Sequence, residues 1–225
     1  ENFDFFDLTA IVRKDWIIDF CTLLIKKNWD ITWQLPSGTR SEALDEEALP
    51  LLYKSGCRSI IYAPESGSPK MLKKIKKKIK PKNLIESVST CVKSKISTSA
   101  NLILGLPEET KGDILRTYSM VVDLAWAGTH DIRISHFSPY PGSELFSDLQ
   151  SKNLIPSLDN HYFYSLLSAE EQKENGPYTD HYSKPFRNRA ILAGYLLFFG
   201  LSYLRRPWRF ARMISNLMAH RSETL

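Results

Sequence analysis

The sequence has few cysteines, and the three that it has stand far apart. Cys21, Cys57 and Cys91 show neither the close spacing of a metal-binding knuckle nor the even, clustered pattern of a disulfide framework. The five histidines are scattered too, without the i, i+4 spacing of a zinc site. The cysteine content therefore predicts a chain that works in the reducing cytoplasm, and the histidines predict no zinc site.

A large excess of charge and a membrane-spanning run are also missing. The 225 residues carry 30 basic and 25 acidic side chains, a net charge of +5 that by itself implies no nucleic-acid partner. The apolar block at 190–204 spans roughly 22 Å as a helix, short of the bilayer core of about 30 Å. With 43% hydrophobic residues, the chain is expected to be globular with a sizeable core.

Short apolar runs alternate with longer runs that have helical spacing. The pattern predicts strands at 2–6, 30–35, 58–63, 98–104 and 131–137, and helices at 14–28, 41–55, 82–95 and 110–127. This order is typical of a parallel sheet with crossover helices, either a partial barrel or an open doubly wound sheet. In both architectures the ligand site lies at the carboxyl ends of the strands.

Small, turn-forming and polar residues follow every predicted strand. They occupy residues 7–9, 36–40, 64–68, 105–110 and 138–143. A carboxylate, a guanidinium and several hydroxyls on one rim suit a ligand that has both an amino-acid end and a sugar. Each run taken alone is equally compatible with an ordinary turn between a strand and a helix.

Taken together and in order, three segments are more specific. The segment RSEALDEEALPLLYKSGCRSIIYAPESGSPKML is followed by NLILGLPEET and then by FSPYPGSELF. This ordered triple resembles the radical S-adenosylmethionine (SAM) superfamily. It is most similar to the branch in which a cobalamin (B12)-binding domain precedes the radical domain, which includes magnesium-protoporphyrin monoester cyclases and many anaerobic methyltransferases. The resemblance covers about residues 1–150.

The resemblance implies a TIM-like partial (β/α) barrel that binds SAM and a [4Fe-4S] cluster. It implies a truncated core at 1–149, beginning at the family's second barrel strand, and a loop-rich then helical C-terminal extension at 150–225. The residues that match the family's SAM contacts are Asp7 (facing the amino group), Ser37 and Arg40 (able to pair with the carboxylate), Glu65 and Ser66 (a polar pair), and Gly105, Leu106 and Pro107 (beside the adenine).

The iron–sulfur loop of the family is missing from the sequence. The family binds its cluster through cysteines spaced C-x3-C-x2-C after the first barrel strand, and no cysteine here fits that spacing. The chain also opens at Glu1 and runs directly into the apolar stretch 2–6. We therefore expect a fragment whose cluster ligands lie upstream, and which alone binds no cluster and is inactive.

Two basic segments stand apart from the predicted barrel. Residues 70–82 hold eight lysines and no acidic residue, with apolar residues on one stripe, which predicts an amphipathic helix with a solvated lysine face. No aromatic residue is interleaved for base stacking, which argues against nucleic acid as the partner. Segment 187–212, with its apolar block between arginines, suits either peripheral contact with the inner face of the membrane or packing across the barrel bottom or onto a missing domain.

We therefore expect the C-terminal part of a radical SAM enzyme that acts on a small-molecule substrate by 5′-deoxyadenosyl radical chemistry or methyl transfer. Its partner would be the upstream half of the same protein, which would bind the cluster and, in this branch, cobalamin. Two alternatives stay open: a relative of the tRNA methylthiotransferases, and a non-catalytic module for a membrane surface or a protein. An aldolase-type barrel lacks support because no strand-end lysine is available for a Schiff base.

Overall fold

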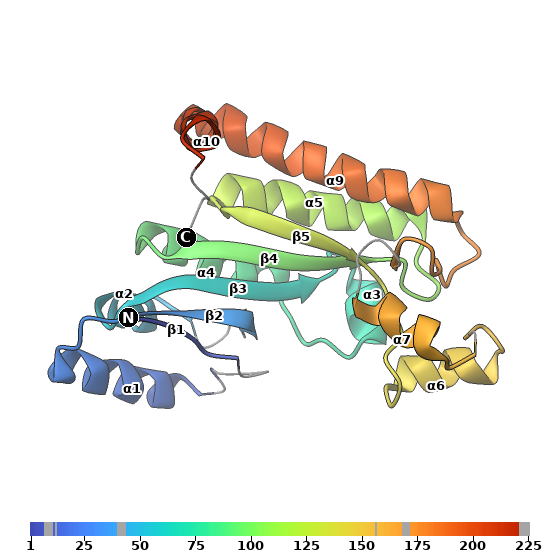
Figure 1. The fold of residues 1–225 in the computed structure, drawn as a ribbon, viewed down its shortest axis with the longest axis horizontal. Helices are drawn as coiled ribbons and strands as arrows, with labels where there is room; N and C mark the ends of the chain where they lie inside the picture. Colours follow the sequence, from blue (N-terminus) through green and yellow to red (C-terminus); the bar gives the residue numbers. More distant parts are fainter. Residues whose placement is uncertain (7–10, 12, 40–43, 156, 168–171, 221–225) are drawn as a thin grey trace.

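The computed structural model describes residues 1–6, 11, 13–39, 44–155, 157–167 and 172–220 (Figure 1). One parallel sheet runs through it, with its strands hydrogen-bonded to one another in chain order. The strands are β1 (Asn2–Asp4), β2 (Thr32–Thr39), β3 (Cys57–Glu65), β4 (Ser97–Leu104) and β5 (Asp131–His136). Each strand predicted from the sequence is present, with its ends shifted by a few residues at most.

Strand order decides between the two architectures that the sequence left open. A doubly wound sheet reverses direction at one point, so that some strands consecutive in the chain are separated in the sheet. Here each strand pairs with the next one along the chain. Because parallel crossovers are right-handed, steps in one direction place their helices on one face, as in a barrel. The chain is an α/β protein with a partial (β/α) barrel, which confirms the predicted fold class.

Helices connect the strands and continue the chain beyond β5. They are α1 (Lys14–Lys27), α2 (Ala48–Lys54), α3 (Pro69–Lys74), α4 (Pro81–Lys93), α5 (Lys111–Ala127), α6 (Glu144–Ser151), α7 (Asn160–Leu167), α9 (Lys184–Arg205) and α10 (Pro207–Met218). Within the part of the chain that the structure describes, no helix combines the length and apolarity needed to cross a bilayer.

The two faces of the sheet differ in polarity. On β4, Ala100 and Leu102 are fully buried in the core that the sheet shares with α4, α5 and α9. Alternate residues of a strand point to opposite faces, so Ser99 and Asn101, both half-buried, lie on the face away from these helices. A polar inner face of this kind is suited to a polar ligand.

Helix α9 belongs to the same core as the barrel helices. It lies along α5 and β5 (Figure 1), and its Ile191 and Phe198 are buried. Gly194 allows the close approach, because a Cβ there would lie 2.5 Å from Cδ1 of Ile134. The backbone N–H of Ile134 donates to the Tyr195 hydroxyl at 2.9 Å, so α9 also satisfies a backbone group of β5, which lies at the edge of the sheet.

The lysine-rich segment differs from its prediction. A single amphipathic helix over residues 70–82 is wrong, because α3 ends at Lys74 and Lys76 has a left-handed backbone with a φ of 57°. The next helix, α4, begins at Pro81. A proline suits the first turn of a helix and disrupts its middle, so it separates two short helices here.

Candidate functional site

The carboxyl ends of β2, β3 and β4 lie side by side at the same end of the sheet. β2 pairs with β3 as far as Thr39, and β3 pairs with β4 as far as Glu65. The segments that follow these strands, including 66–68 and 105–107, therefore form one rim. Helices α3, α6 and α7 lie near the same end of the sheet (Figure 1).

Glu65 provides a carboxylate on this rim. It ends β3 in a left-handed backbone conformation, with a φ of 65°, where the pairing with β4 shifts register. Non-glycine residues in this conformation are strained, and such strain clusters at functional sites. The side chain is 19% exposed, and its Oε1 lies 2.9 Å from Nζ of Lys77. The carboxylate is thus already paired with an ammonium group.

Ser66 and Gly67 turn toward α5 instead of the rim opening. The Ser66 hydroxyl is fully buried and lies 3.2 Å from the hydroxyl of Thr117. A Cβ at Gly67 would lie 2.3 Å from the backbone oxygen of Arg116, so the close packing of this turn on α5 requires glycine. Of the polar pair predicted from the sequence, only Glu65 has a side chain that is open to a ligand in this structure.

The segment 105–107 is buried at the end of β4. Gly105 has a φ of 97°, which glycine adopts without strain, and its N–H donates to Glu109 at 2.8 Å. Leu106 is buried in a small apolar cluster with Phe137, which directly follows β5. The backbone that the resemblance places beside the adenine is therefore held from two sides.

Glu109, which the sequence reasoning did not single out, is fully buried behind this segment. Its Oε2 accepts hydrogen bonds from the Gly105 N–H and the Tyr182 hydroxyl, whereas Oε1 has no partner among the described residues. Burial raises the pKa of the Glu109 carboxyl to about 7. In the sequence Glu109 follows another acid, Glu108, and only the fold decides that the second one is buried.

Lysines of the segment 70–82 neutralise carboxylates around the rim. The ion pairs join Lys74 to Glu108, Lys76 to Glu144, and Lys77 to Glu65. The partners come from the turn after β4, from α6 and from β3 respectively. The lysine run is therefore only partly a solvated face, because three of its ammonium groups are bound to carboxylates near the strand ends.

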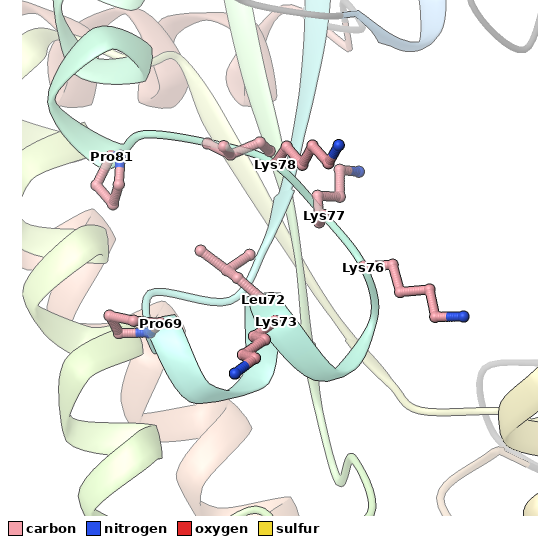
Figure 2. Close-up of a pocket in the computed structure, with 8 residues that line it drawn as sticks. Pro69, Leu72, Lys73, Lys76, Lys77, Lys78 and Pro81 are labelled. Carbon is pink, nitrogen blue, oxygen red and sulfur yellow. The ribbon is translucent and has the colours of Figure 1, made fainter.

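A cleft of about 510 Å³ lies beside the rim, between α3 and the start of α4 (Figure 2). Leu72 points into it between Pro69 and Pro81, while the ammonium groups of lysines 76–78 point outward on one side. The cleft therefore has apolar walls and a basic margin. Because it shares Lys77 with the rim, we treat it as a border of the candidate site.

The remaining predicted positions are less informative. Ser37 lies within β2 and is exposed. Asp7 and Arg40 lie outside the described residues, so their roles stay predictions. His136, one of the five scattered histidines and not a predicted site residue, ends β5 as a packed side chain: its Nε2 lies 3.2 Å from Oδ1 of Asn188 on α9, on the helix side of the sheet.

The cysteines do not converge on one point. Cys21, Cys57 and Cys91 are free and buried, on α1, β3 and α4 respectively. Burial raises the pKa of the Cys91 thiol to about 12 and that of Cys57 well above its usual value, so both stay protonated. Among the described residues no three histidines, cysteines or acids are grouped to hold a metal. These residues do not fit a [4Fe-4S] cluster, which requires converging thiolates.

A parallel (β/α) barrel with polar residues at the strand ends is an architecture that many enzymes share. Comparison with family models identifies the family to which this chain belongs. The family model of the radical SAM superfamily matches residues 2–121. The chain therefore belongs to the radical SAM superfamily, an enzyme family whose members use SAM and a [4Fe-4S] cluster. Coproporphyrinogen III oxidase (HemN) from Escherichia coli, a radical SAM enzyme, has the same fold, with a TM-score of 0.53 at 14% identity, over 85% of this chain and 38% of that chain.

Curated relatives include methyltransferases and cyclases. An uncharacterised methyltransferase of Pyrococcus horikoshii is 27% identical over 71% of this chain and 34% of its own length. The anaerobic magnesium-protoporphyrin IX monomethyl ester cyclase of Rubrivivax gelatinosus is 24% identical over 83% of this chain and 34% of its own length. The chain thus spans about a third of the length of these relatives.

Proposed function

We propose that this chain is the SAM-facing and substrate-facing part of a longer radical SAM enzyme that carries out methyl transfer or cyclisation on a small molecule. The similarity to a methyltransferase and to a protoporphyrin ester cyclase supports both reaction classes. The single observation that carries the proposal is Glu65, a strained and partly exposed strand-end carboxylate that already binds an ammonium group. SAM carries two cationic groups, an ammonium and a sulfonium, and a carboxylate attracts either one.

In this proposal the residues of the chain bind and orient, while the bound SAM supplies the 5′-carbon or the methyl group that reacts. Glu65 would hold a cationic group of SAM in the place that Lys77 now occupies. The buried segment 105–107 would offer a fixed backbone edge beside the adenine. The polar inner face of the sheet, with Ser99 and Asn101, would face the substrate.

The proposal places the [4Fe-4S] cluster, and cobalamin if the enzyme uses it, on residues outside this chain. The dispersed and buried cysteines support this for the cluster. The chain alone would then bind SAM without cleaving it. The three free, buried cysteines also support a cytoplasmic setting for the enzyme.

Equilibrium dialysis with labelled SAM tests the binding role. We expect Glu65→Gln to weaken SAM binding about tenfold or more, since a hydrogen bond to a charged group is worth roughly 1.5–3 kcal/mol. The matched control is Glu144→Gln, which removes another carboxylate paired with a lysine, on α6. The control should stay within about twofold of wild type, as expected for an exposed pair. Absence of SAM binding by the wild-type chain, or an equal loss in both variants, would contradict the proposal.

A further inference from the structure

Helix α10 exposes large apolar side chains and buries none. Among its residues, Trp208 is 64% exposed, Leu217 70% and Met218 79%. Phe210, Ile214 and Leu217 follow one another at intervals of four and three residues, which places them on one stripe of the helix. A helix with such a stripe is amphipathic. Phe210 packs edge-on against Tyr203 of α9, with 5.4 Å between the ring centroids, whereas Ile214 and Leu217 stay exposed.

The helix is nevertheless firmly positioned. Arg206 donates to the backbone oxygen of Ala125 at 3.1 Å, and Arg209 donates to those of Gly128 and Thr129, both at 2.8 Å. These carbonyls lie at the carboxyl end of α5, and the carboxyl end of a helix attracts cations. The last turn of α5 has no basic residue of its own. The apolar stripe is therefore presented in a fixed direction.

Helix α9 adds further exposed leucines. Leu192 is 58% exposed, Leu196 67% and Leu204 81%, and Leu204 lies just before the bend into α10. α9 forms the outer layer over α5 (Figure 1). Monomeric proteins rarely expose so many large apolar residues together, and such surfaces mark contact with a membrane or a protein.

The charge around this surface indicates which of the two it meets. Between Arg205 and Arg212, at the bend and the start of α10, the sequence has four arginines and no acidic residue. Arg205 and Arg212, on either side of the start of α10, are exposed. Apolar side chains bordered by arginines and lacking acids match the anionic headgroups and acyl chains of a lipid bilayer.

The position of the surface leaves the candidate site accessible. α10 contacts residues just before β5, such as Thr129, whereas the rim lies after the carboxyl ends of the strands. The two therefore lie at opposite ends of the sheet (Figure 1). We propose that α10, with the adjoining end of α9, binds the surface of an anionic lipid bilayer, lying in the interface without crossing it.

Vesicle flotation tests this proposal with the 225-residue chain. We expect flotation with vesicles of phosphatidylcholine mixed with phosphatidylglycerol, weaker flotation with phosphatidylcholine alone, and release at high salt. Leu217→Glu should raise the lipid concentration for half-binding at least about tenfold, because it replaces an exposed leucine that would enter the bilayer interface with a charged side chain. The control is Leu115→Glu, the same change at a 65% exposed site near the start of α5, which should float like wild type.

Three outcomes would overturn the proposal. They are no flotation of the wild-type chain on anionic vesicles, equal flotation on neutral ones, and equal loss of binding in both variants. A fourth outcome would overturn it as well: a dimer in analytical ultracentrifugation that Leu217→Glu abolishes would show that a second copy covers the surface. Leu217 is not buried, so unchanged far-UV circular dichroism is expected to show that its replacement leaves the fold intact.

Discussion

Nζ of Lys77 lies 2.9 Å from Oε1 of Glu65, so the strand-end carboxylate of the candidate site holds an ammonium group from its own chain. Lys77 comes from the connection between α3 and α4, twelve residues after Glu65. Lys77 thus occupies the place that a cationic group of SAM would take. If the proposed function is correct, Lys77 and SAM compete for the Glu65 carboxylate.

We therefore expect Lys77→Gln to strengthen SAM binding about two- to fivefold, because a partly exposed ion pair of this type is worth up to about 1 kcal/mol. Equilibrium dialysis measures the change. Lys76→Gln is the matched control, since the neighbouring lysine pairs with Glu144 on α6. Weaker binding in Lys77→Gln would show that the lysine holds Glu65 in place instead of competing.

Because Glu109 is buried, we expect the unfolding free energy of the chain to fall as pH rises. Burial raises its pKa from the usual 4.5 to about 7, so in the folded chain it keeps its proton longer than in the unfolded chain. The stabilising contribution is complete below pH 4.5 and is lost as pH rises through 7. The wild type should therefore lose roughly 2–3 kcal/mol of unfolding free energy between pH 5 and pH 8 that Glu109→Gln does not lose.

Urea unfolding at several pH values checks this difference. The control is Glu108→Gln, because Glu108 is exposed and its pKa is lowered by Lys74, so it stays ionised across that range. A difference between Glu109→Gln and wild type that does not change with pH would argue against a protonated Glu109. The amide can still accept from the Gly105 N–H, which limits structural disturbance.

Two glycines of α9 predict different effects of the same substitution. Gly194→Ala should leave the chain about 1–3 kcal/mol less stable than Gly200→Ala does, because its Cβ would lie 2.5 Å from Cδ1 of Ile134 and force that side chain to shift. Gly200→Ala meets nothing within 4 Å and should stabilise it by roughly 0.5–1 kcal/mol through helix propensity. Thermal unfolding measures both, and equal effects would contradict the close packing of α9 on β5.

Anaerobic reconstitution with iron and sulfide should leave the chain without a stoichiometric cluster. The physical reason is that Cys21, Cys57 and Cys91 are buried on separate elements and burial raises the pKa of each thiol. Iron content and charge-transfer absorbance are the measurements. A variant with all three cysteines replaced by serine should bind the same background of iron, and a cluster found only in the wild type would refute the assignment.

The sequence pattern predicts an element correctly where the spacing of its apolar residues matches the way the folded chain buries them. The alternation at 98–104 predicts β4 within one residue, because a half-buried strand has period two. The helix predicted over 41–55 was too long: α2 begins at Ala48, next to Asp45, which accepts a hydrogen bond from the Ala48 N–H at 3.1 Å. Polar residues before a helix suit a capping turn as well as a first helical turn, and the sequence does not distinguish them.

The sequence by itself determined the repeating strand and helix order, the family, and the strand-end positions that contain Glu65 and 105–107, because these depend on short-range periodicity and on motifs. The tertiary structure alone decided the strand order, the burial of Glu109 against Tyr182 and the pairing of Lys77 with Glu65. It also decided that Arg206, just before α10, and Arg209 within it cap α5, about 80 residues away in the chain. Such contacts depend on how elements meet in space, which local sequence does not encode.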